Sequence, residues 1–200
     1  MDAPIAVGAE AVVTVSEFLG RKAAVKTRVP KRYRHGELDR RIRAARTRNE
    51  VRVMQGARSD TVRTPVVYDV EMSGCSITME FIEGVRVKDP SSSKEVCPLI
   101  GEALADMHNR GIAHGDFTTS NMILMPDGRL CIIDFSLGSI NVGTEEMGVD
   151  IRLLQRAFSS AHSAVEGGFE AVMGSYVEKK TDAGTVLGKV EEIKNRARYT

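Results

Sequence analysis

Several protein classes need features that this sequence lacks. Its three cysteines, Cys75, Cys97 and Cys131, are odd in number and widely spaced, which excludes a closed disulfide framework and a Cys-x-x-Cys zinc pattern. No apolar run approaches the roughly 18 to 20 residues that span a bilayer, so we expect no membrane contact. No basic and apolar leader is visible at the N-terminus. Together with the few cysteines, this leads us to expect a cytoplasmic protein.

The overall composition is that of a folded globular chain. Of 200 residues, 42% are hydrophobic and 28% are charged, which excludes low-complexity disorder, collagen and a coiled-coil rod. This length gives an expectation of one to two domains and is enough to bury a sizeable core.

Charge is distributed unevenly, although the formal net charge is only +1. The segment from Arg21 to Arg48 holds twelve Lys or Arg and two acids, whereas the remainder holds 16 Lys or Arg and 25 acids. A separation of this size indicates a polyanionic partner. A solvated helix face would have the same composition, so charge alone leaves both interpretations open.

The pattern of elements changes along the chain. Up to about Ile82 the segments are short and rich in Val, Ile, Thr and Phe, as strands are. One long helix, 37–57, interrupts them, and we expect Leu38, Ile42, Ala45 and Val53 to form its apolar stripe. The predicted strands cover 11–18, 23–29, 66–71 and 76–81.

Beyond Gly84 the pattern is mostly helical, so the fold class is α+β. A hairpin is expected where Pro126-Asp127-Gly128 separates two apolar runs, 122–125 and 130–134. The predicted helices cover 93–110, 150–162, 169–179 and 185–198.

The strongest chemical signal is the segment from His114 to Asn121. Asp116 and Asn121 lie five residues apart, and a following apolar strand ends at Asp134. A carboxylate that accepts a hydroxyl proton, together with an Asn and a second Asp as hard oxygen ligands for Mg²⁺, meets the needs of phosphoryl transfer. Either Asp116 or Asn121 alone would be an ordinary turn cap. The three residues in this order favour the catalytic interpretation.

Two residues in the first half of the chain agree with it. Lys26 ends a predicted strand, as the phosphate-binding lysine of protein kinases does. Glu50 in the following helix could pair with Lys26 and direct its ammonium toward the α- and β-phosphates of ATP. An ordinary edge-strand lysine and a surface partner for Arg46 remain open alternatives.

This set resembles the protein-kinase superfamily, and more specifically the PRPK-type family, the small atypical Ser/Thr kinase subunit of the KEOPS complex. Its compact length resembles the archaeal members. The resemblance runs from about residue 5 to the C-terminus. It is carried by the segments 8–11, 25–28, 31–35, 38–39, 46–50, 114–121 and 149–151.

The resemblance implies a two-lobe kinase-like fold, with an N-terminal lobe over 1–82 and a C-terminal lobe over 83–200. It implies ATP and Mg²⁺ as cofactors, Asp116 as the catalytic residue, and Asn121 and Asp134 as metal ligands. His114 and Asp150 are expected to support the catalytic loop. The nucleotide-binding residues that it implies are Gly8, Ala9, Glu10, Ala11, Lys26, Glu50, Met79, Glu80 and Ile82.

The resemblance also implies a role in forming threonylcarbamoyladenosine on tRNA. Expected partners are the threonylcarbamoyl-transferase subunit, a small subunit on the N-terminal lobe, and tRNA. ATP hydrolysis with Ser/Thr autophosphorylation is the implied activity. The expected RNA or partner face comprises Lys31, Arg32, Arg34, Arg46, Arg48, Arg196 and Arg198.

Departures from ordinary kinases qualify the expectation. Gly115 stands where most kinases have the Arg that receives an activation-loop phosphate, so we expect no switch of that kind. Ser136 replaces the usual Gly after Asp134-Phe135. Only 16 residues separate Asp134 from Asp150, so the platform for a peptide substrate is essentially missing.

Three other functions fit the sequence less well. An aminoglycoside-type phosphotransferase shares the His-Gly-Asp segment, but it needs a substrate-binding insertion for which this chain is short. A catalytically silent scaffold fits poorly because every metal and proton-transfer position is filled. A plain RNA-binding module lacks support from an aromatic RNA-binding motif, and the chain has no Trp.

Overall fold

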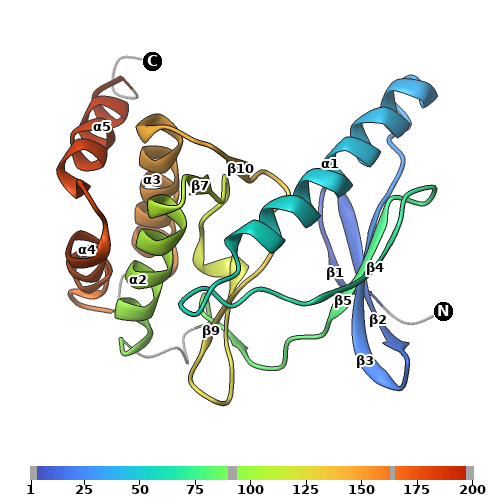
Figure 1. Ribbon diagram of the computed structural model, residues 1–200, viewed down its shortest axis with the longest axis horizontal. Helices are drawn as coiled ribbons and strands as arrows, with labels where there is room; N and C mark the ends of the chain where they lie inside the picture. The colour runs from blue at the N-terminus through green and yellow to red at the C-terminus, as the bar shows by residue number, and fades with distance from the viewer. Residues whose placement is uncertain (1–3, 90–93, 163–164, 197–200) are drawn as a thin grey trace. The chain divides into compact units, whose positions relative to one another are not determined.

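The computed structural model describes residues 4–89, 94–162 and 165–196. Its contacts divide the chain into two compact units, which are described separately below (Figure 1). Unit 1 comprises residues 1–52 and 65–82, and unit 2 comprises residues 53–64 and 83–200. The division after Ile82 falls where the sequence changes character, but the segment 53–64 belongs with the second unit. No helix in the described ranges is long and apolar enough to cross a bilayer.

Unit 1 is built on an antiparallel five-stranded sheet in the order β1-β2-β3-β5-β4. Its strands are β1 (Pro4–Val7), β2 (Ala11–Phe18), β3 (Arg21–Arg28), β4 (Val67–Glu71) and β5 (Ser76–Glu80). The hairpin between β2 and β3 turns through Leu19 and Gly20, both with positive φ, as tight two-residue hairpins require. The four predicted strands are confirmed to within two residues, and β1 was missed because it is only four residues long.

Helix α1 (Gly36–Ala57) has the predicted extent, but its predicted apolar stripe is confirmed only at Val53, which is buried. Leu38 is 51% exposed and Ala45 is exposed as well. The buried positions in its first four turns are polar, namely Asp39, Thr47 and Glu50. They follow the helical period, so the helix has a buried face that a search for apolar residues cannot detect.

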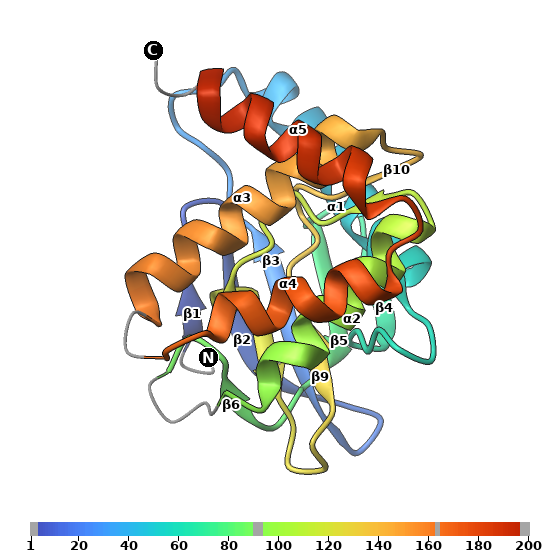
Figure 2. The same ribbon diagram turned by 90° about the vertical axis from the view of Figure 1, so that its left-hand side faces the viewer.

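Unit 2 contains four longer helices that pack in two pairs, α2 (Val96–Asn109) with α4 (Gly168–Lys179) and α3 (Thr144–Ala161) with α5 (Ala183–Arg196) (Figure 2). Gly101 allows the close approach of α2 to α4, because an added Cβ would lie 2.1 Å from the carbonyl oxygen of Val172. The predicted apolar residues Ile100, Leu104 and Phe158 are all buried. Ser93, the predicted start of the second helix, lies outside the described residues. The third helix, α3, starts earlier than predicted.

Helix α3 begins at Thr144, six residues before the predicted start. The carboxylate of Glu146 accepts the backbone N–H of Gly143 at 3.1 Å, which caps the first turn. Glu145 and Glu146 in that turn also face the positive end of the helix dipole. The first residues of α3 are polar, and its first apolar residue is Met147. A search for apolar residues at the helical period therefore misses the first turn of the helix.

Unit 2 also contains two small sheets of short strands. A three-stranded sheet joins β6 (Val85–Arg86), β8 (Met122–Leu124) and β9 (Leu130–Ile132), and β7 (Ile112–Ala113) pairs with β10 (Ser139–Ile140). The hairpin of β8 and β9 confirms the predicted one, whereas strands of two residues are too short to predict from alternation. A 3₁₀ turn, η1 (Thr119–Asn121), leads directly into β8.

Candidate active site

In unit 1 the structure brings Lys26 and Glu50 together. The Lys26 Nζ lies 2.7 Å from Glu50 Oε1, and both side chains are buried. The second carboxylate oxygen of Glu50 accepts a hydrogen bond from the guanidinium of Arg28, which is also buried. One carboxylate therefore holds two cations, and α1 and β3 are fixed to each other through charge as well as packing.

Glu10 adds a second carboxylate near this group. It pairs with Arg46 and lies 4.0 Å from Arg28. The hydrogen bond from Arg46 is the main reason why the pKa of Glu10 is lowered, and the charge of Arg28 adds to it. Glu10 lies within the turn that is closed by the hydrogen bond from Gly8 N–H to Ala11 C=O at 2.9 Å, so its pair with Arg46 ties the predicted phosphate loop to α1.

The residues predicted to meet adenine lie at the end of β5. Met79 is buried opposite Ala24, and Glu80 lies opposite Ala23. The Glu80 carboxylate accepts the N–H of Val66 at 3.0 Å, and the Glu80 N–H donates to the Val66 carbonyl at 2.8 Å. Ile82 is half-buried at the end of unit 1. The adenine contact itself stays a prediction.

In unit 2 the structure brings Asp116 and Asn121 together. The Asn121 side-chain amide donates to both the backbone oxygen and the Oδ2 of Asp116, each at 2.9 Å. The turn between them is closed by hydrogen bonds from Thr118 N–H to Asp116 C=O and from Asn121 N–H to Thr118 C=O, each at 2.9 Å. With its nitrogen used on Asp116, the Asn121 side chain has its oxygen to offer a cation.

Asp134 directly follows a residue that is hydrogen-bonded to Asn121. The N–H of Ile133 donates to the backbone oxygen of Asn121 at 2.9 Å, so the residue preceding Asp134 is bonded to the proposed metal ligand. Asp134 has a φ of 64°, which is uncommon for a residue other than glycine. The Ser136 hydroxyl donates to Asp134 Oδ1 at 2.5 Å, so the residue that departs from the kinase pattern contacts the carboxylate directly.

The donor chemistry of this group fits Mg²⁺. An amide oxygen and a carboxylate are hard ligands, and Mg²⁺ usually takes one or two protein oxygens and completes its shell with water and phosphate. No cluster of three or more His, Cys, Asp or Glu that could hold a metal occurs among the described residues. The group therefore suits a cation that arrives with a nucleotide rather than one held by protein ligands alone.

A buried network supports the segment from His114 to Asn121. Asp150 accepts the backbone N–H of His114 at 2.7 Å and that of Gly115 at 2.8 Å. Its Oδ2 also lies 3.5 Å from His108 Nε2, and His108 Nδ1 lies 2.9 Å from the Tyr176 hydroxyl. Burial lowers the pKa of His108. Burial is also the main cause that raises the pKa of Tyr176, and the negative charge of Asp150 adds to it.

His114 is buried and forms hydrogen bonds through both of its ring nitrogens. Its Nδ1 accepts the N–H of Asp116 at 3.2 Å, so Nε2 carries the proton and donates to the Ile133 carbonyl at 3.0 Å. The ring also packs against Phe117 and Phe135. His114 thereby links the segment that holds Asp116 to the strand that leads to Asp134.

Gly115 is required by its backbone. Its φ is 77°, and an added Cβ would lie 2.2 Å from the carbonyl oxygen of Leu137. The Arg that most kinases have at this position could not be accommodated here without moving the segment after Asp134.

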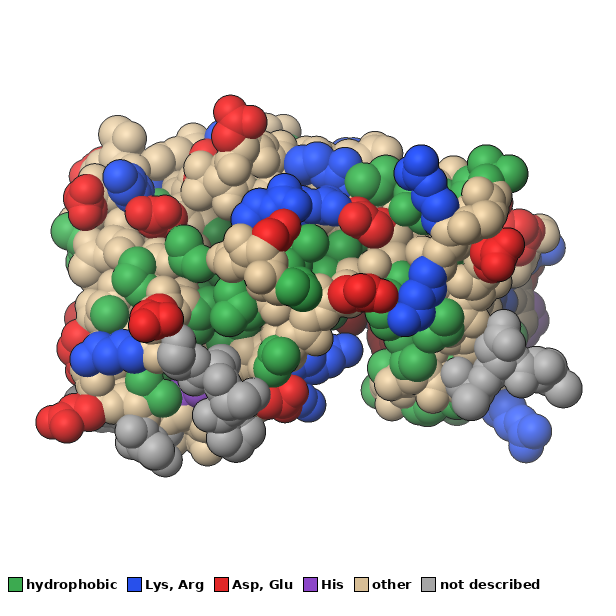
Figure 3. Space-filling model, turned by 90° about the horizontal axis from the view of Figure 1, so that it is seen from below, with side chains coloured by type: hydrophobic (Ala, Val, Ile, Leu, Met, Phe, Trp, Pro, Cys, Tyr) green, Lys and Arg blue, Asp and Glu red, His purple; other side chains and the backbone are tan. Residues whose placement is uncertain are grey.

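The expected RNA or partner face is only partly free. Lys31 donates to the Ala9 carbonyl, and Arg46 pairs with Glu10. Arg34 lies 3.7 Å from Asp39, and Arg196 pairs with Glu145. Arg32 and Arg48 are exposed, while Arg198 lies outside the described residues. Figure 3, a view from below that labels none of these residues, shows a face on which acidic and basic side chains are interspersed.

Sequence reasoning missed four residues of this arrangement. Arg28 was given no role of its own in the site, although a second cation two residues after Lys26 on the same strand face was a readable signal. Ser136 was noted only as a departure. His108 and Tyr176 read as ordinary apolar-face residues, and no local signal joins positions 68 residues apart.

Comparison with known proteins shows the family of the chain. A family model described as "RIO domain" matches residues 10–162. The "KEOPS complex subunit Bud32" of Pyrococcus abyssi is 39% identical over 207 residues, covering 96% of this chain and 94% of that protein. The "EKC/KEOPS complex subunit Tp53rkb" of Mus musculus is 37% identical, covering 96% and 84%.

Longer relatives contain a region similar to the whole chain. The "Probable bifunctional tRNA threonylcarbamoyladenosine biosynthesis protein" of Methanosarcina mazei is 45% identical over 197 residues, covering 96% of this chain but 35% of that protein. The chain thus spans about a third of such relatives.

Among solved structures, the Rio2 kinase–ADP/Mg²⁺-phosphoaspartate complex from Chaetomium thermophilum aligns with a TM-score of 0.67 at 12% identity. The alignment covers 98% of this chain and 70% of that one, and it shows the protein-kinase-like fold. The chain therefore belongs to the RIO-domain family of atypical kinases, in the group that includes the KEOPS subunit Bud32.

Proposed function

We propose that this protein is the ATP-dependent kinase or ATPase subunit of a KEOPS complex and supports threonylcarbamoyladenosine formation on tRNA. The observation that supports the proposal is the hydrogen-bonded pair of Asp116 and Asn121, to which Ile133, the residue before Asp134, is also bonded. Relatives that match nearly the whole chain are named as a KEOPS subunit and as tRNA threonylcarbamoyladenosine biosynthesis proteins, which supports the proposed complex and pathway.

Each residue has a defined role in this proposal. Asp116 accepts the proton of the attacking hydroxyl or water, and the Asn121 amide keeps its carboxylate in position. Asn121 and Asp134 hold Mg²⁺, which would neutralise charge on the ATP phosphates. Lys26 contacts the α- and β-phosphates, and Glu50 fixes its ammonium.

The short segment between Asp134 and Asp150 bears on the acceptor. It carries β10 and leaves little chain for a peptide platform. Gly115 also removes the Arg of a phosphate-operated latch. We therefore infer weak Ser/Thr autophosphorylation by the isolated protein and ATP hydrolysis as the main reaction of the assembled complex.

Partners follow from the same proposal. The threonylcarbamoyl-transferase subunit docks on unit 2 near the catalytic segment and residues 136–148, which blocks access of large protein substrates. A small KEOPS subunit docks on unit 1, tRNA binds the assembly, and the complex acts in the cytoplasm.

Reconstitution with radiolabelled ATP tests the proposal. Phosphate release and phosphoprotein are scored for the chain alone, with the transferase subunit, and with both transferase and tRNA. We expect autophosphorylation to fall and phosphate release to rise as the assembly is completed, because tRNA that binds the closed state better will stabilise it. Undiminished autophosphorylation with tRNA-insensitive hydrolysis would instead indicate a free-standing protein kinase.

A further inference from the structure

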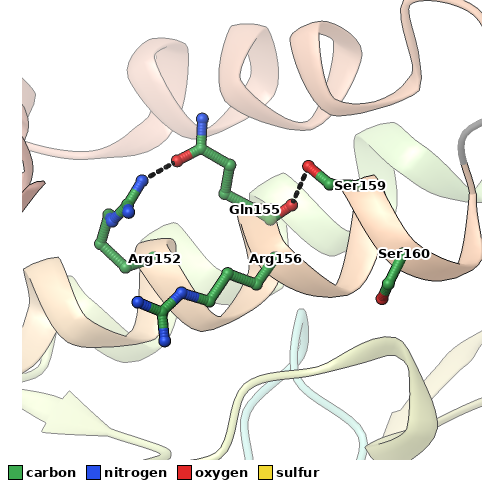
Figure 4. A pocket seen from close by; sticks show the side chains of 5 residues that line it. All are labelled: Arg152, Gln155, Arg156, Ser159 and Ser160. Atoms are coloured by element: carbon green, nitrogen blue, oxygen red, sulfur yellow. Dashed lines mark hydrogen bonds between the residues drawn. The ribbon is translucent and has the colours of Figure 1, made fainter.

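One face of α3 in unit 2 forms a pocket that the proposed reaction does not use. It is a shallow depression of about 360 Å³, open to solvent and lined by Arg152, Gln155, Arg156, Ser159 and Ser160 (Figure 4). We call it the α3 pocket. Its lining offers only cations, an amide and hydroxyls, and no acidic residue occurs from Ile151 to Val165.

The two arginines of the α3 pocket carry uncompensated charge. Arg152 donates to the Gln155 side chain, and the Arg156 side chain runs along α3 in the direction of Arg152 (Figure 4). Within the ranges that the structure describes, neither guanidinium forms an ion pair with a carboxylate. The other end of α3 differs, because Glu145 there pairs with Lys189 and Arg196 of α5.

The remaining polar groups can turn toward a ligand. The Ser159 hydroxyl donates to the Gln155 carbonyl at 3.0 Å, and the Ser160 hydroxyl donates to the Ala157 carbonyl at 3.2 Å. These are local bonds within one helix that a hydroxyl exchanges at little cost. Two arginines one helical turn apart, flanked by hydroxyls and an amide, match an oxyanion better than any neutral or cationic ligand.

Two other uses of the pocket fit less well. A protein partner would need a buried apolar or aromatic anchor, and the lining provides none. Phosphorylation of Ser159 or Ser160 would place negative charge in the last turn of α3, where the helix dipole disfavours it. Proteins commonly contact nucleic-acid phosphates through Arg, Ser and Gln side chains, which are the types that line the α3 pocket.

We propose that the α3 pocket binds the sugar-phosphate backbone of tRNA, with Arg152 and Arg156 each contacting a phosphate. This assigns a phosphate contact to unit 2 that is separate from the basic segment of unit 1. It rests on the tRNA role proposed above, which names no residue of α3.

Salt-dependent binding of a labelled tRNA transcript to the full chain tests the proposal. We compare wild type with the double variant Arg152→Gln/Arg156→Gln. Affinity at low salt should fall about tenfold, and the log–log salt slope should decrease in magnitude by about 1.4 to 1.8, since two phosphate contacts are lost. Both side chains lie on the surface of α3, so unfolding midpoints should match the wild type.

Two further variants make the result specific. Lys94→Gln/Lys179→Gln removes the same charge from exposed positions of unit 2 and should change the slope much less. Arg152→Lys/Arg156→Lys keeps the charge, so it should keep the slope while losing part of the affinity, because lysine cannot form the bidentate contact.

The contrary outcomes are distinct. Equal log–log salt slopes for Arg152→Gln/Arg156→Gln and for Lys94→Gln/Lys179→Gln would overturn the proposal while leaving the tRNA role intact. Loss of transferase binding with unchanged tRNA binding would identify the pocket as a protein-docking surface instead. A wild-type chain that binds no tRNA would remove both this inference and the RNA part of the proposed function.

Discussion

At the scale of single residues, Asp116 depends on its neighbour for its orientation. The Asn121 amide fixes the Oδ2 of Asp116, and a nearby strand fixes Asn121 in turn. Asp116→Asn keeps the size and most hydrogen bonds of the side chain but cannot accept the proton. We expect phosphate release to fall by roughly 10²- to 10⁴-fold, measured as steady-state turnover of ATP. Nucleotide affinity should stay near the wild-type value, and a variant with full turnover would show that Asp116 is not the proton acceptor.

Ser136 should act on the metal through Asp134. Its hydroxyl holds Oδ1 of a residue whose backbone is already in the left-handed region. Ser136→Ala removes that bond, so Mg²⁺ affinity in the presence of ADP should fall about tenfold, the usual scale for losing an outer-shell partner. Calorimetric titration with Mg²⁺ measures this independently of turnover.

A matched substitution checks the cause. Ser136→Thr keeps a hydroxyl at the same place and should recover most of the affinity. Equal Mg²⁺ affinity for wild type, Ser136→Ala and Ser136→Thr would mean that the hydrogen bond has no part in metal binding.

At the scale of elements, α1 is held to its sheet by a buried carboxylate. Glu50 is fully buried and neutralises part of the charge of Lys26 and Arg28. Glu50→Gln leaves two buried cations without their carboxylate, so the free energy of unfolding should fall by about 3 to 5 kcal/mol, measured by urea denaturation. Arg46→Gln, which breaks a more exposed pair with Glu10, should cost about 1 kcal/mol or less. Similar losses for both variants would contradict the buried-pair account.

The elements also show where prediction from sequence succeeds and fails. Residues within one segment, such as Asp116 and Asn121, were predictable because a short turn fixes their spacing, and most helices were predictable because their apolar residues recur with the helical period. The stripe of α1 was predicted wrongly at Leu38 and Ala45, because the buried positions of its first four turns are Asp39, Thr47 and Glu50. The support from Tyr176 through His108 depends on the packing of α2 against α4, which no local pattern encodes.

At the scale of the whole molecule, stability should depend on pH through buried histidines. Burial lowers the pKa of His108 and of His162 below 6.5, so the unfolded chain binds their protons more readily than the folded one. Stability is therefore fully present above about pH 6.5 and decreases as the pH falls below it, by up to about 1.4 kcal/mol per pH unit for each histidine. The lowered pKa of Glu10 contributes stability that is fully present above about pH 4.5 and is lost as the pH falls below that value.

Urea denaturation between about pH 5 and 7 measures this dependence. His108→Gln retains hydrogen-bonding groups but cannot gain the proton, so its stability should vary less with pH than that of the wild type. His35→Gln, a change at an exposed position, serves as the control and should follow the wild type. A His108→Gln profile parallel to the wild type would show that His108 is not the group responsible.

ATP turnover by the purified chain and its Asp134→Ala variant tests the central claim most directly. Phosphate release from radiolabelled ATP is measured at saturating Mg²⁺, with circular dichroism showing that both proteins are folded. Because Asp134 is the proposed carboxylate ligand, the account predicts measurable turnover for the wild type and none for the variant. Hydrolysis by Asp134→Ala at the wild-type rate would contradict it.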